Sequence, residues 1–195
     1  MARPAPTEPS TDARYTSERY FELVSQGVLI SPDDRVELLE GVIVAMAPQN
    51  PPHAAATSQV TRAIFRAVGE RAAIRVQLPL VLRRYSVPEP DVAVVAGRES
   101  DYNHAHPTTA LLIVEVADSS LVQDRITKAA IYAAAGIPEY WLVNLRDDRV
   151  EVLRSPDRRA RKYTASSIAR RGERIALVAL PEAGVAVDDL LPAPE

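Results

Sequence analysis

Two short apolar runs near the middle of the chain have the composition of buried β-strands. Residues 91–95 read Asp-Val-Ala-Val-Val, and residues 111–117 read Leu-Leu-Ile-Val-Glu-Val-Ala. Both runs are rich in β-branched residues, and neither alternates polar with apolar positions as a half-exposed strand does. The pattern therefore predicts strands inside a sheet that is covered by helices.

Turn residues and helical spacing predict the elements on either side. Thr16 is a suitable N-cap for a helix that reaches Gln26 and ends at Gly27. Residues 35–47 are expected to form a β-hairpin that turns near Glu40-Gly41. Helices are also predicted over 53–71 and 122–135, and strands over 74–84, 140–145, 149–154, 162–163 and 175–180. The expected fold is α/β, with a central mixed sheet, flanking helices, an N-terminal helix and hairpin, and C-terminal β additions.

The length of the chain, 195 residues, is ordinary for one domain with a sizeable core. Residues 1–13 are rich in proline and are expected to form a disordered tail. One domain over residues 14–195 is the predicted organisation.

Each of the two buried runs contains a carboxylate, Asp91 after Pro90 in the first and Glu115 within the second. An ionised side chain in such a setting loses hydration and needs a partner. Two acids that converge repel each other unless a cation lies between them, and a hard divalent metal ion bound by oxygen atoms is a natural cation for that place. Two alternatives stay open: Asp91 as a turn residue at the strand entry, and Glu115 at a strand end facing solvent.

Lys128 lies on the predicted helix over residues 122–135, which is apolar on most sides. Ile126 belongs to one apolar face, while Asp124 and Lys128 share the opposite stripe. A lysine that reaches back toward the preceding strand can lie beside both carboxylates. The alternative is an ordinary ion pair between Asp124 and Lys128 on a wet helix face, which contributes a few tenths of a kcal/mol.

Composition removes several classes of function. The chain has no Cys, which excludes disulfides, thiolate metal sites and cysteine nucleophiles. Its N-terminus lacks the apolar core of a secretory signal, and no apolar run approaches the roughly 18–20 residues of a membrane span. A cytoplasmic protein is therefore expected. The glycine patterns of dinucleotide and P-loop sites are also missing from the sequence.

Charge is unevenly distributed along the chain. The net charge is −3, which argues weakly against nucleic-acid binding by the whole surface. Residues 154–174, however, contain eight basic and two acidic residues, a local charge of +6. Arg158, Arg159, Arg161 and Lys162 are therefore candidate phosphate contacts. The alternative interpretation is a solvated hairpin rich in arginine.

These residues resemble a known group of proteins. Pro90-Asp91, followed by a strand with Glu115-Val116-Ala117, resembles the PD-(D/E)XK nuclease superfamily. The chain resembles one branch of that superfamily more closely, the Uma-two family of restriction-endonuclease-like proteins, over roughly residues 35–190. That similarity is carried by the sequence blocks 35–48 (RVELLEGVIVAMAP), 114–121 (VEVADSSL), 124–128 and 132–143 (YAAAGIPEYWLV), and by His53.

The resemblance implies a restriction-endonuclease-like core and a DNA endonuclease that depends on Mg²⁺ or Mn²⁺. Asp91 and Glu115 would bind the metal, which activates water and neutralises charge on the phosphate. The superfamily pattern has Lys two residues after the Glu, where this chain has Ala117; in this branch the lysine corresponds to Lys128. His53 would act as an acid or base, a metal neighbour or a phosphate contact, although a helix-start histidine can also simply satisfy backbone groups.

Glu37 is a further candidate for the site, since it can face the same carboxylates from the hairpin.

A homodimer would suit the cutting of both strands of a duplex. The alternative functions are a catalytically inactive nucleic-acid-binding protein and a structural protein on the same fold, whose acids only form ion pairs.

Overall fold

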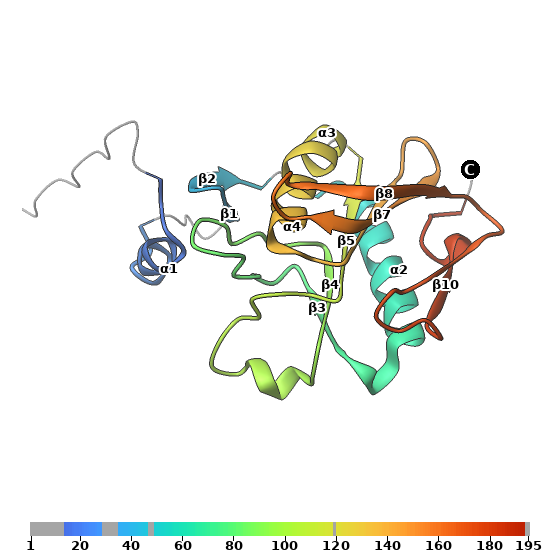
Figure 1. The fold of residues 1–195 in the computed structure, drawn as a ribbon, viewed down its shortest axis with the longest axis horizontal. Coiled ribbons are helices and arrows are strands. Elements are labelled where there is room, and N and C mark those ends of the chain that lie inside the picture. Colours follow the sequence, from blue (N-terminus) through green and yellow to red (C-terminus); the bar gives the residue numbers. More distant parts are fainter. Residues whose placement is uncertain (1–13, 29–34, 47–48, 119, 194–195) are drawn as a thin grey trace, which may run out of the picture.

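The computed structural model describes residues 14–28, 35–46, 49–118 and 120–193 (Figure 1). The predicted disordered tail, residues 1–13, lies outside this range. No helix in the described part of the chain is both long and apolar enough to cross a membrane.

Helices and strands are interspersed along the chain. The helices are α1 (Ser17–Ser25), α2 (Pro51–Val68), α3 (Leu121–Gln123) and α4 (Ala129–Ala135), with a π-helical segment (Asp124–Lys128) joining the last two. Short 3₁₀ helices cover Gly69–Arg71, Glu99–Tyr102 and Val187–Asp189. The strands are β1 (Val36–Leu39), β2 (Val42–Ala45), β3 (Ala73–Val76), β4 (Val92–Val95), β5 (Leu112–Ala117), β6 (Glu139–Asn144), β7 (Arg149–Asp157), β8 (Lys162–Ala169), β9 (Arg174–Ala176) and β10 (Gly184–Ala186).

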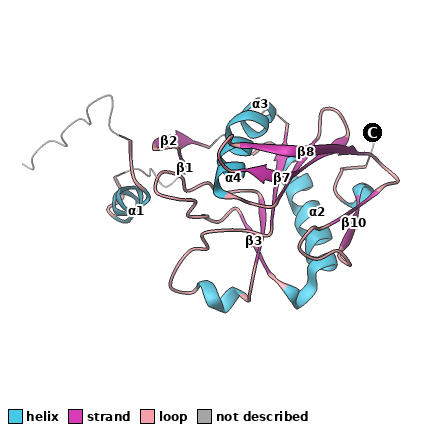
Figure 2. Cartoon of the chain, in the orientation of Figure 1, coloured by secondary structure: helices cyan, strands magenta, loops and turns pink. Residues whose placement is uncertain are grey.

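A six-stranded mixed sheet is the centre of the fold, in the order β3-β4-β5-β6-β7-β8. Neighbouring strands are antiparallel except β5 and β6, which are parallel and are joined by the α3–α4 crossover (Figure 2). Helix α2 packs on one face of the sheet and α4 on the other, so the prediction of a mixed sheet flanked by helices is confirmed.

Strand β5 shows how the sheet sorts its side chains between the two faces. Leu112, Val114 and Val116 pack with α2, whereas Ile113 and Ala117 pack with α4. Side chains alternate with a period of two along a strand. Glu115 therefore belongs to the face that α4 covers, which places its carboxylate beneath the crossover helix.

The N-terminal additions form as predicted. Thr16 caps α1 by accepting a hydrogen bond from the Arg19 backbone N–H at 3.3 Å. The β1–β2 hairpin turns at Glu40-Gly41, where both residues have positive φ. Such a two-residue turn matches the right-handed twist of its strands.

Three sequence predictions are wrong in detail. The strand expected over residues 74–84 ends at Val76, because Gln77 has a φ of 50° and leaves the strand. The strand expected over 175–180 is the shorter β9, which pairs with β10 in a separate two-stranded sheet. On the crossover helix, Ile126 was expected on an apolar face but is 65% exposed, while Asp124 and Lys128 on the opposite stripe are buried.

Candidate functional site

The register of β4 and β5 brings Asp91 and Glu115 together. Val92 lies opposite Val114, and one further step along this antiparallel pair places Asp91 opposite Glu115. The Asp91 backbone N–H donates to Glu115 Oε2 at 3.2 Å. The Val116 N–H donates to Asp91 Oδ2 at 2.9 Å. Both side chains are buried, so Glu115 does not face solvent at a strand end. Asp91 lies in a bend at the entry to β4, as the alternative has it, yet its carboxylate faces inward.

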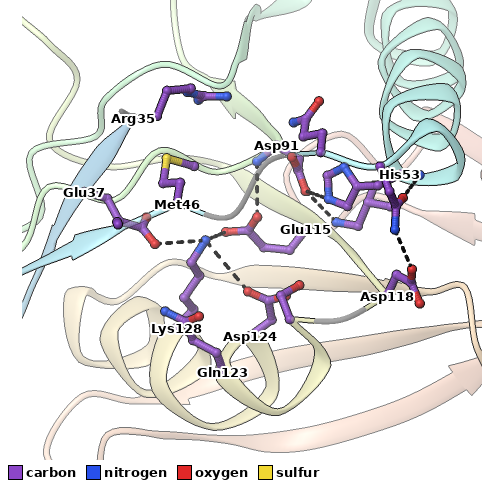
Figure 3. A pocket seen from close by; sticks show the side chains of 15 residues that line it. Arg35, Glu37, Met46, His53, Asp91, Glu115, Asp118, Gln123, Asp124 and Lys128 are labelled. Carbon is purple, nitrogen blue, oxygen red and sulfur yellow. Dashed lines mark hydrogen bonds and ion pairs between the residues drawn. The ribbon is translucent and has the colours of Figure 1, made fainter. Parts of the chain in front are cut away.

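Lys128 reaches the same point from the π-helical segment of the crossover. Its Nζ lies 3.1 Å from Glu115 Oε1, 3.5 Å from Glu37 Oε1 and 3.8 Å from Asp124 Oδ1 (Figure 3). The lysine is only 6% exposed, and therefore the i,i+4 pair with Asp124 is not a wet surface pair. A π-helical turn in place of an α-helical one is frequent at functional sites.

Glu37 and Asp124 complete the buried acids around this lysine. Glu37, on β1, accepts the Glu89 N–H at Oε2 over 3.3 Å. Asp124 accepts the Ser120 hydroxyl at 2.5 Å. Both carboxylates are buried. The expectation that Glu37 faces the site is consistent with this geometry.

His53 lies at the first turn of α2, where Asn50 caps the helix and accepts the His53 backbone N–H at 2.9 Å. Its Nε2 is 3.4 Å from Asp91 Oδ2, and its Nδ1 is 3.4 Å from the Thr57 hydroxyl. The imidazole therefore contacts a candidate metal ligand directly, while the backbone of the helix start is satisfied by Asn50.

These six side chains line one cavity of about 110 Å³. We call it the acidic cavity and define it by Glu37, Asp91, Glu115, Asp124, Lys128 and His53. Arg35 and Asp118 also line the cavity, so five carboxylates face one lysine, one arginine and one histidine, and negative charge is in excess even when the imidazole is protonated. An excess of buried negative charge favours either bound protons or a bound cation.

The pKa values follow from this imbalance. Burial raises the pKa of Glu115 to about 8, against the effect of Lys128, and burial likewise raises those of Glu37 and Asp124. Burial alone would lower the pKa of Lys128, but Glu115, Glu37 and Asp124 hold it above its ordinary value. The lysine is therefore a fixed cation.

Asp91 and His53 shift in opposite directions because they contact each other. Burial opposes ionisation of Asp91, yet the contact with His53 lowers the pKa of this carboxyl overall. The same contact raises the pKa of His53, against the effect of its own burial. The two side chains thus form an ionised pair more readily than either would ionise alone.

The donor set fits a hard divalent cation held by two carboxylates. Asp91 Oδ1 accepts one hydrogen bond, from Gln77, and Glu115 Oε2 accepts one, from Asp91, so both oxygens retain acceptor capacity. The described residues contain no group of three or more His, Cys, Asp or Glu side chains arranged to hold a metal ion. Mg²⁺ commonly uses one or two carboxylates, with water and substrate phosphates as its other ligands.

Sequence reasoning missed several residues that shape this cavity. The Tyr132 hydroxyl donates to Glu115 Oε1 at 2.6 Å, and the spacing of four from Lys128 was the only signal for it. Gln77 donates to Asp91 Oδ1 at 3.1 Å from a position of positive φ that no sequence pattern marks. Asp118, held by Asn50 at 2.9 Å, also lines the cavity and is a more exposed acid.

The predicted phosphate contacts lie elsewhere. Arg158, Arg159 and Arg161 are in the β7–β8 turn and Lys162 begins β8; none of the four lines the acidic cavity. The charge of +6 in this part of the chain is also partly neutralised by distant acids. Arg154, for example, pairs with the buried Glu139 at 2.6 Å.

Two comparisons with known proteins gave matches that extend along most of the chain. Residues 17–188 match the model of the Uma2 family, which is described as "Putative restriction endonuclease". A crystal structure of a putative nuclease belonging to DUF820 from Anabaena variabilis is similar in fold, with a TM-score of 0.70. It is 18% identical in sequence, and the similarity covers 90% of this chain and 96% of that one. No curated protein matches the chain.

Proposed function

Because this chain belongs to the Uma2 family of putative restriction endonucleases, we propose that its acidic cavity hydrolyses phosphodiester bonds of DNA with a divalent metal ion. The observation that carries the proposal is the convergence of Asp91, Glu115 and Lys128 from two strands and a crossover helix. Two buried acids beside a buried lysine form a constellation suited to metal-assisted attack of water on phosphate.

Asp91 and Glu115 would hold the ion, Mg²⁺ or Mn²⁺. A bound ion of this kind lowers the pKa of water and neutralises charge that develops on the phosphate. Asp91 is the acid of the pair that is ionised at neutral pH, since its pKa is lowered. Glu115 has a pKa near 8, so it would release a proton when the ion binds at pH 7.

Lys128 would act through its charge and its hydrogen bonds. Its raised pKa keeps the ammonium protonated, which makes it a poor base and a permanent positive group. Placed 3.1 Å from Glu115, it would orient that carboxylate and stabilise negative charge on the phosphate. On this proposal the lysine's role belongs to the helix and not to position 117, where the Ala117 side chain packs in the core under α4.

His53 would set the charge state of Asp91. Their contact at 3.4 Å favours the ionised carboxylate, which is the form that binds a metal. The imidazole also lines the cavity, where it can contact a phosphate oxygen of the substrate. The ring is accessible from the cavity, because its side chain is 17% exposed, against 3% for Glu115.

Arg158, Arg159, Arg161 and Lys162 would contact the DNA backbone outside the cavity. All four are exposed or partly exposed, and guanidinium groups bind phosphate in a bidentate manner. Phosphate contacts position the duplex without reading its sequence. The homodimer stays a prediction; a two-fold pair would let each copy cut one strand.

The test is cleavage of supercoiled plasmid by the purified protein. Nicking or linearisation is expected with Mg²⁺ or Mn²⁺ and should stop when EDTA is added. Asp91→Asn should be inactive, whereas Asp118→Asn, which changes a more exposed acid of the same cavity, should retain activity. DNA binding without cleavage under either ion would instead support the non-catalytic binding protein on this fold. Equal cleavage by wild type and Asp91→Asn would contradict the proposal.

A further inference from the structure

A second hollow, of about 530 Å³, is lined in part by Ile131 and Ala134 of α4. We call it the arginine pocket. Its volume is within the range of about 300–1,000 Å³ that is usual for small-molecule sites. Its basic lining residues are Arg14, Arg83, Arg84, Arg158, Arg159 and Arg161. Glu40 is the one carboxylate among the described residues that line it.

Three tight turns converge to build this pocket. They are the β1–β2 turn at Glu40, the turn closed by the Leu82–Ser86 bridge, and the β7–β8 turn before Lys162. Each turn contributes a charged residue in the left-handed region: Glu40 (φ 53°), Arg83 (φ 61°) and Arg161 (φ 56°). A long charged side chain at such a position costs about 1 kcal/mol or more in backbone strain, and such strain gathers at ligand sites.

Hydrogen bonds between the turns fix their relative positions. The Gly41 N–H donates to the Tyr85 carbonyl at 2.6 Å, and the Glu40 N–H donates to the Ser86 hydroxyl at 3.0 Å. Arg161 forms an ion pair with Glu40, which links the third turn to the first. The pocket is therefore preorganised, which reduces the entropy lost when a ligand binds.

Among the residues that the structure describes, most of the positive charge in the pocket has no acidic partner. Within the described ranges, no carboxylate lies at ion-pair distance from any of the pocket arginines other than Arg161. In contrast, Arg125, Arg154 and Arg171 elsewhere on the surface each pair with an acid. A cluster of unpaired guanidinium groups around a hollow favours a multiply charged anion, and the fork of donors on each group suits phosphate.

The pocket and the acidic cavity share two structural elements. Glu37 lines the cavity and Glu40 lines the pocket, three residues along one hairpin, which is about 10 Å in an extended strand. Lys128 and Ala134 lie six positions apart on one crossover helix, which is about 9 Å. The two sites are therefore close enough for one nucleic-acid strand to contact both.

We propose that the arginine pocket is a phosphate-binding site that holds a backbone phosphate of the nucleic-acid substrate, on the same strand as the bond in the acidic cavity. This inference rests on the proposed function, because it takes the scissile bond to lie in the acidic cavity. The pocket binds a phosphate of the backbone and not a base. A substrate strand must therefore extend beyond the scissile bond far enough to reach the pocket.

The experiment measures binding of a fluorescent duplex in EDTA, so that cleavage does not enter the result. Arg158→Ala/Arg159→Ala should bind about tenfold more weakly, the effect expected when charge-assisted hydrogen bonds to phosphate are lost. The log–log salt slope should become shallower by about 0.9 for each phosphate contact removed. Arg62→Ala/Arg66→Ala, which removes the same charge from the outer face of α2, is the matched control and should change neither quantity.

A second pair of substitutions comes from a different turn of the pocket. Arg83→Gly/Arg84→Ala removes two charges, and glycine relieves the positive φ at residue 83. It should weaken binding as the first pair does, which keeps the test decisive if one variant does not fold. The losses should be the same with or without a 5′-phosphate on the DNA; a loss confined to 5′-phosphorylated ends would overturn the assignment to a backbone phosphate.

The remaining outcomes separate this inference from the proposed function. If wild type cleaves DNA but both pocket variants match the α2 control in affinity and slope, the pocket inference is wrong and the nuclease stands. If the pocket variants lose binding but wild type never cleaves with Mg²⁺ or Mn²⁺, the proposed function fails and the phosphate site stands. A wild type that does not bind duplex DNA in EDTA would overturn the pocket inference.

Discussion

Lys128 is the residue whose loss should perturb the acidic cavity most. Lys128→Met keeps the approximate volume and removes the charge, which leaves three buried carboxylates at 3.1–3.8 Å without their cation. Breaking a buried pair by removing one partner costs about 3–5 kcal/mol. The free energy of unfolding at pH 8 should fall by about that amount in metal-free buffer.

The loss should be smaller at low pH. Glu115, Glu37 and Asp124 have raised pKa values in the folded protein, so they take up protons as the pH falls and no longer need the lysine. Urea unfolding at pH 5 and pH 8, for wild type and Lys128→Met, measures both quantities. Cleavage should also fall by orders of magnitude, because the cation beside the scissile phosphate is gone.

Arg125→Ala is the matched control for this substitution. Arg125 lies on the same helical segment and also pairs with an acid, Glu151, but its side chain is 40% exposed. An exposed pair contributes about 0–1 kcal/mol, so the control should lose little stability at either pH. If Lys128→Met loses no more than Arg125→Ala, the cavity is wet enough to screen its charges and the reasoning is refuted.

Three further substitutions test the pKa and backbone arguments. In metal-free buffer the folded state binds a proton at Glu115 more tightly than the unfolded state, so stability should fall as pH rises from about 4.5 to about 8; Glu115→Gln should flatten this fall in urea titrations. The pKa of His53 is raised in the folded protein, so protonated His53 adds to the free energy of unfolding below about pH 6.5. This stability is lost as the pH rises through the pKa of the folded state, and His53→Gln should remove it. Gly41→Ala combines a φ of 86° with a new Cβ only 2.5 Å from the Arg14 Cβ, so it should lower the melting temperature. The drop should exceed that of Gly27→Ala, where φ is 65° and nothing lies within 4 Å of the new Cβ. Equal drops would show that the segment at Arg14 moves freely.

The sequence identified the central acids because their signal is local. Asp91 and Glu115 interrupt apolar runs, and the period of two along neighbouring strands places them on one face of the sheet. Lys128 could be proposed for a similar reason, as a cation that shares a stripe with Asp124 on a largely apolar helix. In each case a few adjacent residues carried enough information to predict the contact.

Other features depend on contacts between distant segments and could not be predicted in this way. The π-helical turn that buries Asp124 and Lys128 while exposing Ile126 has no counterpart in a regular helical projection. Strand β3 ends at Val76, earlier than predicted, because Gln77 has a positive φ that no sequence pattern indicates. The arginine pocket needs three turns to meet, and no single stretch of sequence contains it.

The central claim is that Asp91 and Glu115 form one metal site, and titration calorimetry with Mn²⁺ tests it most directly. Wild type and Asp118→Asn should bind the ion alike, since Asp118 is held by Asn50 and Arg146 at the edge of the cavity. Asp91→Asn should lose the heat of binding, because Glu115 would be the one proposed ligand left, and it is paired with Lys128. A titration of Asp91→Asn that superimposes on wild type would contradict the shared site.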